Sequence, residues 1–170
     1  MLRPVDICVL LKLTLPEAWS LSFAQLASDL HLSSSEVHAS IKRSRLSGLF
    51  QHSGVKAVNR TALLEFLEHG LRYAFPAEKG SLTRGIPTAY AAEPLRSALQ
   101  KSDDIPVWPH VEGKVRGSSF APLYKHAPIA ALKDPKLYEL FSLADALRDG
   151  RVRERKLAID ELTKRISEHG

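Results

Sequence analysis

The sequence has little of several features that mark specialised classes of protein. It contains one cysteine among 170 residues, so it cannot form an internal disulfide. No apolar run approaches the roughly 18–20 residues that a membrane-spanning helix needs. The apolar stretch 5–15 contains Asp6 and Lys12 and precedes no small-residue cleavage site, which indicates a core helix and not a signal peptide. We therefore expect a cytoplasmic protein with no membrane contact, in which Cys8 is a buried core residue.

Strong charge of one sign is also missing. The net charge is +5, and basic residues exceed acidic ones by eight to six in 1–75, by seven to five in 76–130 and by nine to eight in 131–170. A basic balance favours polyanionic partners. Because the excess is spread so thinly, any contact with nucleic acid has to come from the placement of a few side chains.

Motifs for catalysis, metals and nucleotides are missing as well. The seven histidines have no ligand-like spacing and only one cysteine accompanies them, which disfavours a structural zinc site. The sequence has no phosphate-loop order, no dinucleotide loop and no nucleophile elbow. Asp103 and Asp104 are adjacent carboxylates beside a proline, without an acid–base partner of obvious role. We therefore expect no catalytic residue, no metal and no cofactor, and thus no enzyme.

The first part of the chain contains a succession of short helical segments with capping signals. A first helix is expected over about 4–13. A second begins at Ser22, which forms an S-x-x-Q capping box. A third follows a second capping box at 33–36, covers about 34–47 and ends at Gly48.

Strand and turn signals come next. The turn-rich tetrapeptide 51–54 lies between short apolar segments and predicts a small β-hairpin. Asn59 is a natural N-cap for a fourth helix, which is expected to run from Thr61 to about Tyr73. The predicted order is therefore helix, helix, helix, hairpin, helix.

The expected third helix has two distinct faces when it is drawn at about 100° per residue. One arc carries small, weakly apolar side chains suited to packing on other helices: Val37, Ser40, Ile41, Ser44 and Gly48. A separate arc carries hydrogen-bonding and cationic side chains: Ser35, His38, Lys42 and Arg45. Such groups contact base edges and phosphates in the DNA major groove. Together with Ser34 at the start of the helix and Lys56 in the hairpin, they form the predicted DNA-binding residues.

This region resembles bacterial winged helix-turn-helix regulators of the MarR-like type. The similarity covers roughly 5–75 and is carried by Phe23-Ala24-Gln25-Leu26-Ala27, Leu30-x-Leu32-Ser33, Glu36-Val37, Ile41 and Gly48-Leu49-Phe50. The resemblance implies DNA binding by the third helix and a homodimer formed by the terminal helices. The chain departs from the family pattern in two ways. Ser44 replaces a core leucine, with Leu46 displaced toward the outer face, and the expected wing at 51–56 is short.

The rest of the chain has a different character. Residues 76–130 hold seven of the ten prolines, and we expect an irregular or partly extended segment that packs on the rest of the chain or on a partner. Residues 131–170 are expected to form helices at about 135–147 and 152–167. Their apolar stripes fit either a dimer interface or packing on the chain's own core.

The sequence therefore predicts a mainly α protein with three parts. These are a winged helix-turn-helix domain at 1–75, an irregular, proline-rich packed segment at 76–130, and C-terminal helices at 131–170 for dimerisation or partner binding. The expected function is sequence-specific binding of double-stranded DNA by a homodimeric transcriptional regulator. The alternative is a protein-binding winged helix module, such as an autoregulating antitoxin that holds a toxin partner through 76–170.

Overall fold

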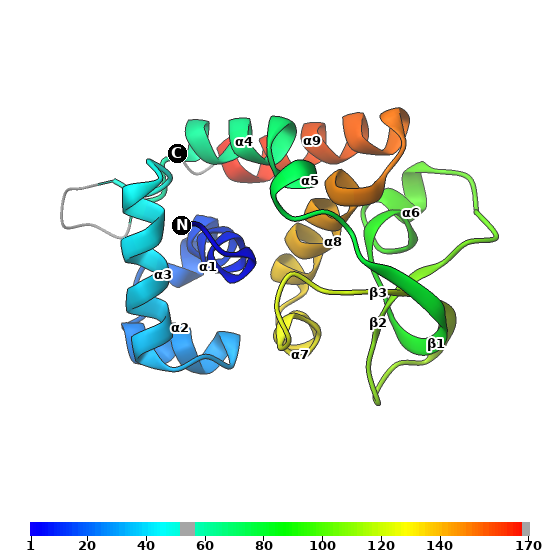
Figure 1. Ribbon diagram of the computed structural model, residues 1–170, viewed down its shortest axis with the longest axis horizontal. Coiled ribbons are helices and arrows are strands. Elements are labelled where there is room, and N and C mark those ends of the chain that lie inside the picture. Colours follow the sequence, from blue (N-terminus) through cyan, green and yellow to red (C-terminus); the bar gives the residue numbers. More distant parts are fainter. Residues whose placement is uncertain (52–56, 168–170) are drawn as a thin grey trace.

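The computed structural model describes residues 1–51 and 57–167 of the chain. This part is mainly helical with one small three-stranded sheet, so the predicted mainly α class is confirmed (Figure 1). Its helices are α1 (Pro4–Thr14), α2 (Phe23–Leu30), α3 (Ser34–Leu46), α4 (Arg60–His69), α5 (Leu71–Ala74), α6 (Leu95–Ala98), α7 (Ala127–Lys133), α8 (Pro135–Asp149) and α9 (Val152–Ser167). Its strands are β1 (Lys79–Pro87), β2 (Pro106–Pro109) and β3 (Val115–Phe120). Within the described ranges, no helix is both long and apolar enough to span a bilayer.

Helix α1 is almost entirely buried, as its apolar sequence predicts. Side chains from Asp6 to Thr14 are covered, and Cys8 is fully buried, where burial raises the pKa of its thiol. The charged residues of this helix have partners: Asp6 binds Arg43, and Lys12 Nζ lies 3.0 Å from a carboxylate oxygen of Asp134. A buried charge is tolerated when it is paired in this way. Helix α1 therefore packs between α3 and α8 as the central helix of the fold.

The predicted caps set the ends of α2 and α3. Ser22 and Gln25 form a complete capping box at the start of α2, and Ser33 and Glu36 form another at the start of α3. Gly48 ends α3 with a left-handed φ of 77°, a conformation that glycine adopts without strain. All three signals are confirmed.

The segment after α3 follows the predicted order in part. An antiparallel bridge joins Phe50 and Val58, and the Asn59 side chain caps α4 by accepting from the Ala62 amide. The expected fourth helix is interrupted at Gly70, which separates α4 from α5. Of the predicted hairpin turn at 51–54, only residue 51 belongs to the described part of the chain.

The middle segment is partly extended and more ordered than the sequence indicates, because residues 79–120 contain a small closed barrel. Strand β1 pairs antiparallel with both β2 and β3, and β2 pairs parallel with β3. Two glycines permit this tight closure: a Cβ on Gly85 would lie 2.1 Å from the Trp108 carbonyl oxygen, and one on Gly117 would lie 2.0 Å from that of Ile105. Glycine disfavours helices, and here it allows the strands of the barrel to lie very close to one another.

A buried carboxylate joins α8 to the barrel. Asp145 Oδ2 accepts hydrogen bonds from the Thr88 hydroxyl at 2.7 Å and from the Trp108 indole at 2.8 Å. Its Oδ1 accepts from Arg148 Nη1 at 2.9 Å. The Arg148 guanidinium also donates to the carbonyl oxygens of the chain entering and leaving the barrel, at Phe75, Pro76 and Ala121. Both buried charges are therefore compensated by several partners, which a buried ion pair requires.

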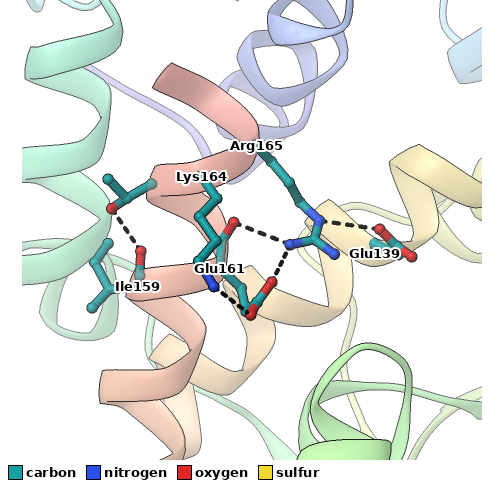
Figure 2. Close-up of polar contacts among 6 residues, drawn as sticks. Glu139, Ile159, Glu161, Lys164 and Arg165 are labelled. Carbon is teal, nitrogen blue, oxygen red and sulfur yellow. Dashed lines mark hydrogen bonds and ion pairs between the residues drawn. The ribbon is translucent and has the colours of Figure 1, made fainter. Parts of the chain in front are cut away.

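The apolar stripe of α9 is covered by the chain itself. Ala158, Leu162 and Ile166 are fully buried, and α9 packs on α4 and α8. Figure 2 shows how Arg165 of α9 reaches Glu139 of α8, with 3.1 Å between Nε and Oε2. The stripe therefore packs on the chain's own core, which is the second of the two alternatives that the sequence allowed.

Candidate nucleic-acid interface

Helix α3 lies at one end of the molecule and presents one face to solvent (Figure 1). Ser34, Ser35, His38 and Lys42 are exposed on this helix. Because residues three or four apart share a helix face, the last three form one continuous strip along α3. The structure therefore brings together four of the predicted site residues on one open surface.

The opposite face of α3 is packed as its small side chains predict. Val37, Ser40, Ile41 and Ser44 are buried, and the Ser44 hydroxyl donates to the Ser40 carbonyl oxygen at 2.8 Å. Serine in place of a larger core residue lets α1 pack closely against this face. The departure at Ser44 therefore does not shift the register of the helix.

Arg43 fixes the orientation of α3 on α1. Its Nε and Nη2 donate to the two carboxylate oxygens of Asp6 at 2.8 and 2.7 Å, a bidentate arrangement. The Asp6 side chain is fully buried. This pair was not predicted from the sequence, although an aspartate inside an apolar helix indicates that a cation must reach it. Arg43 is thus a structural residue, and its neighbours on the outer face are turned toward solvent.

Replacing Arg43 with lysine is expected to lower the free energy of unfolding by about 1.5 kcal/mol. Lysine keeps the charge but loses the two-pronged geometry, and a hydrogen bond to a charged group contributes about that amount. Chemical denaturation of the full chain measures the change. Arg72→Lys is the matched control, because this side chain lies over the exposed ring of Tyr73. Equal stabilities of the two variants would contradict the anchoring role of Arg43.

Arg45 is less open than the sequence predicts. Its guanidinium lies over the Phe50 ring at 5.2 Å from the centroid, and its Nε is buried with no hydrogen-bond partner among the described residues. A guanidinium on an aromatic face is held in one place while its outer edge can still donate. Arg45 is therefore a partly buried, positioned cation at the end of α3.

The outer face continues beyond the predicted residues. Leu46 is 78% exposed and follows Lys42 by one helical turn, in agreement with the predicted displacement of this leucine. His38 packs its ring 4.2 Å from that of Phe23 on α2, which orients the imidazole along the junction of the two helices. Lys56, the last predicted site residue, lies outside the described residues.

Near the beginning of α3 lies a group of side chains that the sequence did not indicate, with one cation, Lys133, beside two imidazole rings. Lys133 Nζ lies 3.1 Å from His31 Nε2, and the rings of His31 and His126 are 6.1 Å apart. Burial, Lys133 and His126 all lower the pKa of His31, so its imidazole remains neutral at pH 7. His31 caps the end of α2, whereas Lys133 belongs to α7 and lies 102 positions further along the chain. No local pattern could have shown that they meet.

Other side chains considered in the sequence have structural surroundings. Asp104 accepts hydrogen bonds from the hydroxyls of Ser118 at 2.8 Å and Tyr90 at 3.0 Å, which lower the pKa of its carboxyl. Asp103 is exposed in the adjacent bend. Over 1–51 and 57–167, histidine, cysteine and carboxylate side chains form no cluster of three that could hold a metal ion.

Comparisons with known proteins return no match, whether against protein-family models, curated proteins or solved structures. The interpretation of α3 therefore depends on the sequence and geometry of this chain.

Proposed function

We propose that the chain is a winged helix-turn-helix protein of the cytoplasm that binds double-stranded DNA sequence-specifically and regulates transcription. Helix α3 is the recognition helix in this proposal. The observation that carries it is the division of α3 into a packed side, anchored by Arg43, and an exposed strip formed by Ser35, His38 and Lys42. A helix in the major groove needs such a strip of donors and acceptors on a rigid support.

The composition of the exposed strip fits recognition of base edges. Lys42 can donate to guanine O6 and N7, while Ser35 and His38 hydrogen-bond base edges of several kinds. Leu46 adds an apolar group of the kind that contacts a thymine methyl. The face thus offers both polar and apolar readout.

Groups at the two ends of α3 are suited to contact the phosphate backbone on the two sides of the groove. Ser34 lies in the first turn of α3, where backbone amides favour anions. Lys133 lies near the beginning of the helix through its contact with His31, and Arg45 lies near its end on Phe50. Phosphate contacts position a protein on DNA, whereas base contacts specify the sequence.

Fluorescence anisotropy with labelled duplexes that tile the region upstream of the protein's own gene tests this function. We expect one fragment to bind more tightly than an unrelated duplex of equal length. If about four phosphates are contacted, its affinity should fall about 100-fold between about 50 and 200 mM salt. Absence of salt-sensitive binding to every fragment would refute DNA binding, and equal affinity for the unrelated duplex would refute sequence specificity.

A partner-binding role is the second candidate, and one observation favours it. Leu82 and Val111 of the barrel region are apolar and are 64% and 91% exposed, so both side chains are available to contact a partner. Because α9 packs on α4, the probe has to be the full chain and not residues 76–170 alone. We expect Leu82→Ser plus Val111→Ser to abolish co-purification of a protein partner without changing DNA affinity. Unchanged co-purification would exclude this surface.

A further inference from the structure

A cavity of about 520 Å³ lies between the barrel, the loop 99–104 and the turn from α8 to α9. It is remote from α3: in Figure 1 the barrel and α3 lie at opposite ends of the long axis, and α9 begins on the barrel side. The volume is within the usual range of about 300–1,000 Å³ for small-molecule sites.

The lining of this cavity is rich in charged side chains, with one more cation than carboxylates. Lys79, Lys101, Arg151 and Arg153 line it together with three carboxylates. Two of these carboxylates are already engaged. Asp149 Oδ2 lies 3.1 Å from Lys79 Nζ, and Asp104 accepts the two hydroxyl hydrogen bonds described above.

Three cations remain once those pairs are formed. In the described part of the chain, Lys101, Arg151 and Arg153 form no ion pair, and they share the cavity with two carboxylates, Asp104 and Glu154, so one positive charge remains in excess. Cations that share a cavity repel one another, so this excess of positive charge favours the binding of an anion. Arg151 and Arg153 flank the beginning of α9, whose first backbone amides add to the positive potential there.

The remaining wall is suited to an organic group. The Tyr90 ring and the Leu99 side chain supply apolar surface, and Ser102 and Gln100 supply neutral hydrogen-bonding groups. Burial and the hydrogen bond to Asp104 raise the pKa of Tyr90, so its hydroxyl remains protonated and bonded to that carboxylate. The cavity lining therefore combines the fixed Tyr90–Asp104 hydrogen bond and apolar surface with cationic side chains.

We propose that this cavity binds a small phosphorylated organic ligand, with its phosphate groups held by Arg151, Arg153 and Lys101. The planar guanidinium fork matches two oxygens of one phosphate, and lysine acts as a point charge on another. The organic part lies against Tyr90 and Leu99. This inference is independent of DNA binding by α3.

Isothermal titration calorimetry of the full chain at constant ionic strength tests the proposal with ADP, inorganic pyrophosphate and citrate as probes. We expect ADP to bind more tightly than pyrophosphate, because only ADP has an organic part, and citrate to bind at least tenfold more weakly than either. Arg151→Gln plus Arg153→Gln should weaken ADP binding at least tenfold.

The matched control removes the same charge elsewhere. Arg84 and Arg116 are exposed residues that lie opposite one another on β1 and β3, and Arg84→Gln plus Arg116→Gln should leave ADP binding unchanged. Equal weakening by both double variants would show non-specific attraction of anions and overturn the proposal. Citrate binding as tight as ADP binding would overturn the preference for phosphate, and no binding of any probe would overturn the site.

Discussion

Replacing Asp145 with alanine is expected to lower the free energy of unfolding by about 3–5 kcal/mol, the usual cost of breaking a buried ion pair. The substitution leaves the Arg148 guanidinium without its carboxylate and leaves the donors of Thr88 and Trp108 without an acceptor. Each buried donor that loses its partner costs about 1–3 kcal/mol by itself. The barrel should therefore lose its main polar attachment to α8.

Denaturant unfolding followed by circular dichroism and tryptophan fluorescence measures this effect. Ser142→Ala in the same helix is the control: its hydroxyl is buried without a hydrogen-bond partner, so its removal should change stability little. If Asp145→Ala does not fold, Asp145→Asn, which keeps the volume and removes the charge, provides the measurement. A loss below about 1 kcal/mol in Asp145→Asn would contradict the role assigned to this carboxylate.

The double substitution Lys42→Ala plus Arg45→Ala is expected to weaken binding to the preferred DNA fragment by well over tenfold. A well-placed cationic side chain on a base edge contributes about 1–3 kcal/mol of discrimination, so two should contribute at least about 2 kcal/mol. If both residues contact phosphates instead, the slope of log affinity against log salt should fall by about two. The slope thus separates base contacts from phosphate contacts.

Two further variants make this result specific to α3. Lys42→Ala alone changes an exposed residue and does not remove the Arg45 contact with Phe50. Arg84→Ala plus Arg116→Ala removes the same charge from the barrel and should leave DNA affinity within about twofold. Equal losses in the α3 and barrel variants would mean that bulk charge, and not the recognition helix, holds the DNA.

Local signals in the sequence were sufficient for most of the N-terminal elements. The capping boxes at Ser22 and Ser33 depend on residues three positions apart, and both form as predicted. The two faces of α3 follow from helical geometry alone, so the burial of Ser44 and the exposure of Lys42 could be predicted. Gly48 ends the helix as predicted, because glycine adopts the left-handed conformation there without strain.

Features that depend on distant parts of the chain could not be predicted in this way. The barrel forms because glycines allow strands to meet closely, yet the same glycines and prolines also occur in irregular loops. The Asp6–Arg43 pair spans 37 positions and the Trp108–Asp145 hydrogen bond spans another 37. The stripe of α9 looked the same whether its partner was a second copy or, as found, α4 and α8 of this chain.

Mapping of ¹⁵N chemical shifts on the full 18.8 kDa chain, titrated with the preferred duplex, tests most directly whether α3 is the DNA-binding surface. We expect the largest shifts at the backbone amides of Ser34, Ser35, His38, Lys42 and Leu46. The amides of Arg84 and Arg116 in the barrel should remain unchanged. Shifts that cluster on β1 and β3 while those of α3 stay constant would contradict the account.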